Sequence, residues 1–231
     1  MKYKDFQKHY SYQRTNKYYK GTSKNKIKSN QLYYSNLRVA QSFYPLLNTL
    51  EVVLRNAIHR NLSLYFDDRS WICNQVNKFM SNKSLVSAGN LFLKKEIIKA
   101  LNKIEGRNQN IVPGRVIAEL SFGFWVAFYD KVHYRILRGS TLACFPYLPP
   151  NVKRKDVFSK LSSIRNFRNR IYHNEPICFV SSQVDFSLCL TAFDDIKEIL
   201  NWIDPNIFDA LQQENLVYAK NIIERERLKY H

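Results

Sequence analysis

The chain has 231 residues, 45% of them hydrophobic, which is enough for a sizeable folded domain with a core of its own. It carries 36 Lys and Arg against 19 Asp and Glu, a formal net charge of +17. A field of that sign attracts polyanions, with nucleic acid first and an anionic membrane surface second. No apolar run approaches the ~20 residues that cross a bilayer, and the N-terminus has no apolar signal core, so we expect a cytoplasmic protein without membrane attachment.

The first 30 residues concentrate this charge, because they hold nine Lys or Arg against a single acid, Asp5. Five tyrosines are interleaved with the cations, which offers rings for base stacking beside ammonium groups for phosphate. A solvated, poorly ordered tail is the alternative interpretation. We predict residues 1–30 as a basic, Tyr-rich extension and residues 31–231 as a single helical domain.

Helical periodicity, with apolar residues three and four apart, dominates the rest of the chain. Pro45 and Pro205 favour the first turn of a helix, and Asp204 is a good cap for the second of these. Gly123, inside an apolar helix, suggests a close approach of another helix. No two-residue alternation is long enough for a sheet, so we predict an all-α bundle. Its helices are expected over residues 45–65, 84–104, 116–130, 153–173, 188–203 and 205–228.

In the last of these helices, Glu214, Glu224 and Glu226 are expected on a solvated surface with a few helix pairs. The four cysteines, Cys73, Cys144, Cys178 and Cys189, are scattered without metal-ligand or disulfide spacing. We therefore predict reduced core thiols, no metal site and no cofactor. His133 also lacks an acid or cysteine at metal-ligand spacing, and His9 and His231 lie near the termini, so we interpret all three as non-catalytic.

The segment RNFRNRIYHNEP, residues 165–176, is the strongest candidate for a functional site. Helical spacing places Arg168 four residues after Ile164, on the apolar stripe, where a guanidinium needs an acid, an interface or an anionic ligand. His173 falls in the last turn, because Pro176 disfavours helix at Glu175. The five-residue step turns His173 about 140° away from Arg168. Either the helix end loosens, or the pocket has two walls.

RNRIYH fits an R, N, three residues, H signature and resembles the HEPN superfamily, small helical bundles of which many are metal-independent ribonucleases. The blocks LNTLEVVLRNAIHRNLSLYF, Trp71, GRVIAELSFGFWVAFY and RNFRNRIYHNEPI together resemble the Abi-like (abortive infection) family of bacterial proteins within that superfamily. The likeness spans roughly residues 32–203. It implies a HEPN-like helical bundle with additional helices that forms a homodimer, with the two motifs near the two-fold axis, and cleaves RNA.

The chemistry of RNA cleavage fits this implication. A base that takes the 2′-hydroxyl proton and an acid that protonates the leaving 5′ oxygen cut RNA without a metal. One motif holds one histidine, so a two-fold axis that brings His173 from each chain together supplies the pair. Arg168 is expected to bind the scissile phosphate, and Asn169 to orient the histidine or the backbone.

Further residues are expected to bind RNA around this catalytic group. Arg165 and Arg170 would extend the phosphate track, and Tyr172 would stack on a base or belong to the core. Lysines of the basic extension complete the set: Lys17, Lys20, Lys24, Lys26 and Lys28.

A second polar cluster, Glu51, Arg55, Asn56 and His59, advances by about fours along one side of the helix over residues 45–65. It either forms another wall of the RNA pocket or is a buried polar seam that fixes helix register.

Two functions compete for the whole chain. The first is an endoribonuclease toxin of a bacterial anti-phage or toxin–antitoxin system, restrained by a protein antitoxin or by an inhibitory RNA. The second is a non-catalytic helical dimer that binds structured RNA and uses Arg168 and His173 only for contacts. A third and weaker interpretation is a partner or target of a nucleotidyltransferase.

Overall fold

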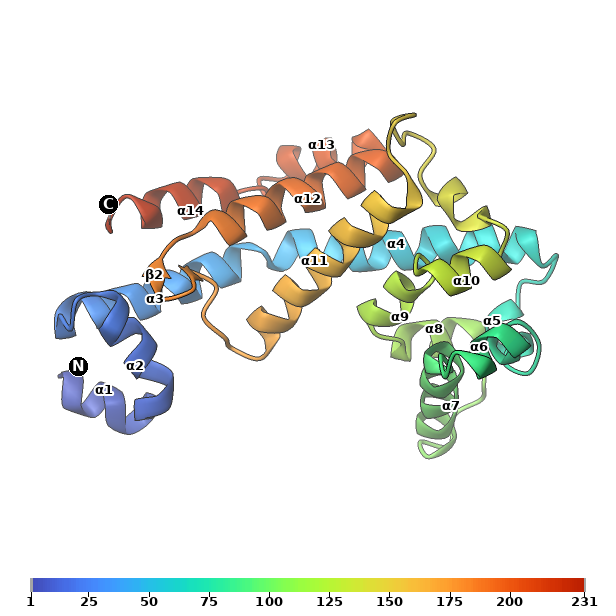
Figure 1. The fold of residues 1–231 in the computed structure, drawn as a ribbon, viewed down its shortest axis with the longest axis horizontal. Coiled ribbons are helices and arrows are strands. Elements are labelled where there is room, and N and C mark those ends of the chain that lie inside the picture. Colours follow the sequence, from blue (N-terminus) through green and yellow to red (C-terminus); the bar gives the residue numbers. More distant parts are fainter. Residues whose placement is uncertain (1, 231) are drawn as a thin grey trace. The chain divides into compact units, whose positions relative to one another are not determined.

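The computed structural model describes residues 2–230, and its 70% helix content confirms the all-α prediction (Figure 1). Its α-helices are α1 (Tyr3–Tyr10), α2 (Tyr12–Gly21), α3 (Lys26–Ser42), α4 (Tyr44–Tyr65), α5 (Trp71–Asn74), α6 (Lys83–Ser87), α7 (Phe92–Glu105), α8 (Pro113–Glu119), α9 (Phe122–Ala127), α10 (Lys131–Ile136), α11 (Arg154–Tyr172), α12 (Ser187–Ile203), α13 (Pro205–Gln213) and α14 (Ala219–Arg227). Two 3-10 turns are η1 (Phe79–Ser81) and η2 (Ser140–Cys144).

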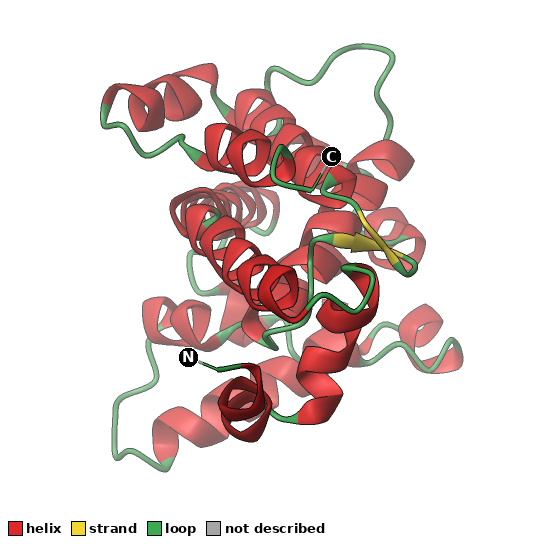
Figure 2. Cartoon of the chain, turned by 90° about the vertical axis from the view of Figure 1, so that its left-hand side faces the viewer, coloured by secondary structure: helices red, strands yellow, loops and turns green. Residues whose placement is uncertain are grey.

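A small antiparallel hairpin interrupts the helices, with strands β1 (Phe179–Val180) and β2 (Gln183–Val184) drawn in yellow in Figure 2. Phe179 lies opposite Val184 in its register. Within residues 2–230, no helix is both long enough and apolar enough to span a membrane.

Three helices expected from periodicity are confirmed within one or two residues, namely α4, α11 and α12. The other three expected helices are each divided in two. Gly89, with φ of +64°, separates α6 from α7, because a left-handed residue cannot continue a right-handed helix. Leu120, in an extended conformation, separates α8 from α9, and left-handed Asn215 lies between α13 and α14.

The chain forms two compact units, each assembled from segments that are far apart in sequence. Of the described residues, unit 1 comprises residues 2–48, 166–197 and 209–230; unit 2 comprises Thr49–Arg165 and Glu198–Phe208. The boundaries fall inside α4, α11, α12 and α13.

An aromatic cluster ties the basic N-terminal residues into unit 1. The Phe6 ring, fully buried, contacts Tyr33 of α3 edge to face at 5.2 Å, and Tyr18 contacts both Tyr33 and Phe179. Gly21 ends α2 where a Cβ would lie 2.5 Å from the Phe179 ring, so only glycine fits without a shift. Residues Tyr3–Gly21 are therefore helices packed on α3 rather than a solvated tail.

A buried carboxylate attaches α14 to α3 within unit 1. Glu226 is fully buried and accepts hydrogen bonds from Ser35 Oγ at 2.6 Å, from Arg38 Nε and Nη2 at 3.0 and 2.9 Å, and from Lys229 Nζ at 2.7 Å. The expectation that Glu226 lies on a solvated surface is wrong, because its main partner, Arg38, is remote in sequence and leaves no local pattern. Arg38, Lys229 and Ser35 together hold the pKa of Glu226 far below its usual range, although burial alone would raise it.

Unit 2 has its own aromatic core. Trp71, Phe124, Trp125 and Phe128 are fully buried, and Phe128 contacts the other three rings at centroid distances between 5.4 and 6.2 Å. A Cβ at Gly123 would meet Arg165 Cδ at 3.5 Å, an ordinary van der Waals contact. The neighbour that approaches Gly123 is thus the side chain of an arginine. This contact leaves room for a Cβ and does not require glycine.

Candidate functional site

The motif lies at the C-terminal end of α11 in unit 1. Val157, Leu161 and Ile164 form the buried stripe of α11, and Arg168 continues this stripe as a half-buried side chain. The Arg168 guanidinium carbon lies 4.2 Å from the centroid of the Tyr172 ring, one turn further along. This cation–π contact fixes the direction of the guanidinium along the helix.

His173 is exposed and lies one residue beyond the last residue of α11. Its N–H still donates to the Asn169 carbonyl at 2.9 Å, so the helical hydrogen bonding does not loosen there. Asn174, with φ of 55°, then reverses the chain. An intact helix keeps Arg168 and His173 on different sides of α11. Of the two alternatives, a loosened helix end and a pocket with two walls, the second therefore stays as the prediction.

Several contacts within unit 1 hold the turn after His173. Arg170 donates from Nη2 to the Pro176 carbonyl, and its Nε lies 3.8 Å from Glu175 Oε2. The Ile177 N–H donates to Oδ1 of Asn36, a buried residue of α3, at 2.7 Å. Arg170 therefore has a structural role in the turn, and its contact with RNA phosphate stays a prediction.

The basic extension reaches the same turn. The exposed Arg14 of α2 donates from Nη1 to the Asn174 carbonyl at 2.5 Å. Arg14 was not predicted as a site residue, because 160 positions separate it from its acceptor and no local pattern joins them. Arg14 thus adds a positive charge beside the motif.

The remaining candidates of the RNA track occupy different surroundings. Asn169 is exposed, and Arg165 is half-buried in unit 2 beside Gly123. Lys17 lies over the Phe179 ring at 4.9 Å, while Lys20 and Lys28 line a polar hollow of about 640 Å³ near the hairpin. All the lysines of the predicted set are exposed: Lys17, Lys20, Lys24, Lys26 and Lys28.

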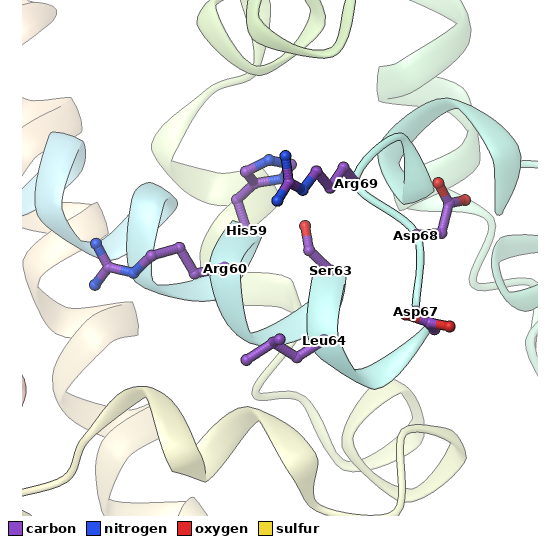
Figure 3. Close-up of a pocket in the computed structure, with 7 residues that line it drawn as sticks. All are labelled: His59, Arg60, Ser63, Leu64, Asp67, Asp68 and Arg69. Atoms are coloured by element: carbon purple, nitrogen blue, oxygen red, sulfur yellow. The ribbon is translucent and has the colours of Figure 1, made fainter.

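The second cluster lies on α4 in unit 2, where Asn56 is exposed and Glu51, Arg55 and His59 are half-buried. Only His59 of the four lines the pocket at the end of α4, whose volume is about 530 Å³ (Figure 3). The other lining residues are Arg60, Ser63, Leu64, Asp67, Asp68 and Arg69. Arg69 extends from the following loop toward His59 (Figure 3), an arrangement made by chain reversal that helical periodicity does not reveal.

The chemistry of this pocket is constrained by Trp71. The indole N–H donates to His59 Nδ1 at 3.0 Å and to the His59 carbonyl oxygen at 3.3 Å; because indole is a donor only, the first of these bonds requires a neutral imidazole with its proton on Nε2. Burial lowers the pKa of His59, which also favours the neutral imidazole. Asp68 is engaged by Ser70 N and Asn74 Nδ2 at 2.7 and 3.0 Å. His59 therefore has a structural partner, and its burial disfavours the charged imidazolium.

Residues 2–230 contain no group of three or more His, Cys, Asp or Glu side chains arranged to hold a metal ion. His133 is fully buried in unit 2, where its Nδ1 lies 2.5 Å from Oδ2 of Asp130, the cap of α10. His9 is exposed on α1, and His231 lies outside the described residues.

The fold and the motif together define a class: an all-α protein with a folded basic N-terminal region and, at a helix end, a motif of a half-buried arginine and an exposed histidine. The sequence model of the Abi-like protein family matches residues 1–178, and the chain belongs to this family. The match includes the basic N-terminal region, which the expected likeness over residues 32–203 left out. Searches of curated proteins and of solved structures found no significant match. Family membership connects the protein with abortive infection.

Proposed function

We propose that the protein is a metal-independent endoribonuclease of abortive infection, of the HEPN type, whose active site is completed in a homodimer. The observation that carries the proposal is the arrangement at the end of α11. There Arg168 is held against Tyr172 at 4.2 Å, and His173 is exposed at the point where the chain reverses. A guanidinium fixed in direction suits a phosphate, and an exposed imidazole suits proton transfer.

The reaction needs two proton-transfer groups and a cation. One His173 accepts the 2′-hydroxyl proton, and the 2′ oxygen attacks phosphorus to form the new P–O bond. The P–O5′ bond breaks, and a second His173 protonates the leaving 5′ oxygen. The products are a 2′,3′-cyclic phosphate and a 5′-hydroxyl, while Arg168 stabilises the charge on the phosphoryl oxygens.

The helix geometry favours a site completed by a second copy. About 140° separates the directions of Arg168 and His173 on an intact helix, so one motif cannot aim both side chains at one phosphate. A two-fold axis near the motif brings a second Arg168 and a second His173 to the same place. The proposal therefore predicts a homodimer in which one inactive motif impairs the composite site.

An enzyme of this kind needs restraint in its own cell. With a net charge of +17, RNA is the inhibitor that the surface attracts most strongly, and a protein antitoxin is the alternative. If six phosphates are neutralised, log Kobs falls with log salt at a slope of about −4 to −5. A flat salt dependence would exclude the electrostatic part of this restraint.

The experiment is cleavage of a defined RNA by purified protein in excess EDTA. Wild type is expected to leave 2′,3′-cyclic phosphate ends, and a 2′-deoxy substitution at the cleaved nucleotide is expected to stop the reaction. His173→Ala should be inactive, whereas the control His9→Ala, at another exposed histidine, should cleave normally. If His173→Ala binds and cleaves like wild type, the ribonuclease proposal is wrong. RNA binding without cleavage by wild type would favour the non-catalytic RNA-binding dimer.

A further inference from the structure

Unit 1 carries a groove of about 440 Å³ beside the motif, in the size range of roughly 300–1,000 Å³ that small-ligand sites occupy. Its floor and walls come from the junction of α3 and α4 and from the end of α11. The lining residues are Leu37, Ala40, Gln41, Tyr44, Leu47, Ile171, Tyr172 and Asn174.

One helical face forms the first wall. Leu37, Ala40, Gln41, Tyr44 and Leu47 follow one another at steps of three, one, three and three, which is the spacing of a single stripe. The stripe continues across the junction because Leu47 N still bonds to the Phe43 carbonyl at 2.9 Å.

The end of α11 forms the second wall, and packing of buried aromatic rings holds it in place. Phe43 and Phe167 are buried and meet edge to face at 4.7 Å, which holds the start of the last turns of α11 against the α3–α4 junction. Tyr172 is then presented at the groove with Arg168 over its ring. The groove is therefore part of the packed structure of unit 1.

The surface of this groove is unusually apolar and aromatic for an exposed position. Tyr44 is 63% exposed, Tyr172 52% and Leu37 39%, whereas most large hydrophobic side chains of the chain are buried. Two primary amides, those of Gln41 and Asn174, lie among these apolar residues. Flat apolar surface with a few amides is the composition that receives a heterocycle, since rings stack and amides pair with its edge.

We propose that this groove binds one unpaired nucleobase of the RNA, stacked on Tyr44 and Tyr172, and so selects the nucleotide next to the scissile phosphate. The proposal rests on the proposed function only in its last clause, since base binding itself does not require cleavage. The amides of Gln41 and Asn174 would contact the edge of the base.

Charge favours a nucleotide over an apolar protein segment as the occupant. The Arg168 guanidinium lies on the Tyr172 ring, and Arg14 lies on the Asn174 carbonyl, so two cations flank the groove. The nucleotide that holds the base brings its own phosphates, which these cations would neutralise. A second copy of this strongly basic chain would bring further positive charge to the same place.

The test measures binding of a fluorescein-labelled single-stranded RNA of mixed sequence to the His173→Ala protein, which cannot cleave it. Tyr44→Ala in that background should weaken binding roughly 5- to 150-fold, the range for one stacked base. Tyr44→Phe should bind like the parent, because its ring is kept. Tyr147→Ala, at another exposed tyrosine outside the groove, is the matched control and should have no effect.

Light scattering and salt titration identify other occupants. The proposal expects an unchanged mass and an unchanged salt slope for Tyr44→Ala, because the variant loses stacking and no phosphate contact. A lower mass would assign the groove to a contact between copies and overturn the proposal. Unchanged affinity of both Tyr44→Ala and Tyr172→Ala would overturn it as well. If wild type fails to cleave while binding still depends on Tyr44, the ribonuclease proposal alone fails.

Discussion

Glu226 offers a quantitative test of how α14 is attached to unit 1. Its side chain is fully buried; Ser35, Arg38 and Lys229 donate to it at 3.0 Å or less, and Arg225 Nε donates to it at 3.3 Å. Glu226→Gln keeps the size of the side chain, removes its charge and turns an NH₂ group toward donors. The variant therefore leaves buried polar groups without their partners.

The expected loss of stability depends on how deeply the carboxylate and its cationic partners are buried. Removing one member of a buried charged pair costs about 3–5 kcal/mol. Arg38 and Lys229 are 41% and 45% exposed and can turn toward water, so the lower end, about 3 kcal/mol, is expected for Glu226→Gln. Glu224→Gln is the matched control, because Glu224 is half-buried, pairs with the half-buried Arg227 near the surface, and should cost less than about 1 kcal/mol.

Hydrogen exchange of peptides from α14 and α3 is the suitable assay, since all three tryptophans lie in unit 2 and do not report on unit 1. A loss of about 3 kcal/mol corresponds to exchange roughly 100-fold faster. The depressed pKa means that this stabilisation is present above the unfolded pKa of about 4.3 and is lost as pH falls toward the folded value. Wild type should therefore approach Glu226→Gln below about pH 4. Equal exchange in Glu226→Gln and Glu224→Gln at pH 7 would refute the reasoning.

Two further predictions concern packing and protonation. Gly21→Ala should lower the free energy of unfolding by about 1–3 kcal/mol in urea titrations followed by circular dichroism, because its Cβ would overlap the buried Phe179 ring; an unchanged midpoint would show that the ring yields freely. His59 should titrate below about pH 6.5 by NMR, and Trp71→Phe should raise that pKa, because the neutral imidazole loses the indole donor to Nδ1; a titration midpoint that does not respond to Trp71→Phe would contradict the assigned tautomer.

Local periodicity predicted the long helices because each of them has a continuous stripe of apolar residues, and this stripe is buried along one side of the helix. Val157, Leu161 and Ile164 are fully buried in α11, as their spacing indicates. The breaks at Gly89 and Leu120 were not predicted, because short helices joined by only two to four residues keep nearly the same three–four pattern. Burial of Glu226 was missed for a different reason, since its partner Arg38 is 188 positions away.

The candidate site shows the same contrast between local spacing, which sequence reveals, and contacts remote in sequence, which it does not. The RNRIYH signature made Arg168 and His173 candidates from sequence alone, because Arg168 lies in the last turns of α11 and His173 directly follows this helix, so their spacing determines their geometry. Arg14 and the groove residue Tyr44 had no comparable signal, because they reach the motif through the packing of α2 and the α3–α4 junction in unit 1. Sequence thus revealed the motif itself but not the surface that surrounds it.

Induced expression in a bacterial host, with sequencing of new RNA ends, tests the central claim most directly. Wild type is expected to arrest growth and to produce RNA ends with 2′,3′-cyclic phosphates, while equally soluble His173→Ala does neither. The same induction in a strain that overexpresses a candidate inhibitory RNA should restore growth if RNA provides the restraint. Intact RNA and identical growth with both proteins, in cells where no nucleic acid co-purifies with wild type, would contradict the ribonuclease account.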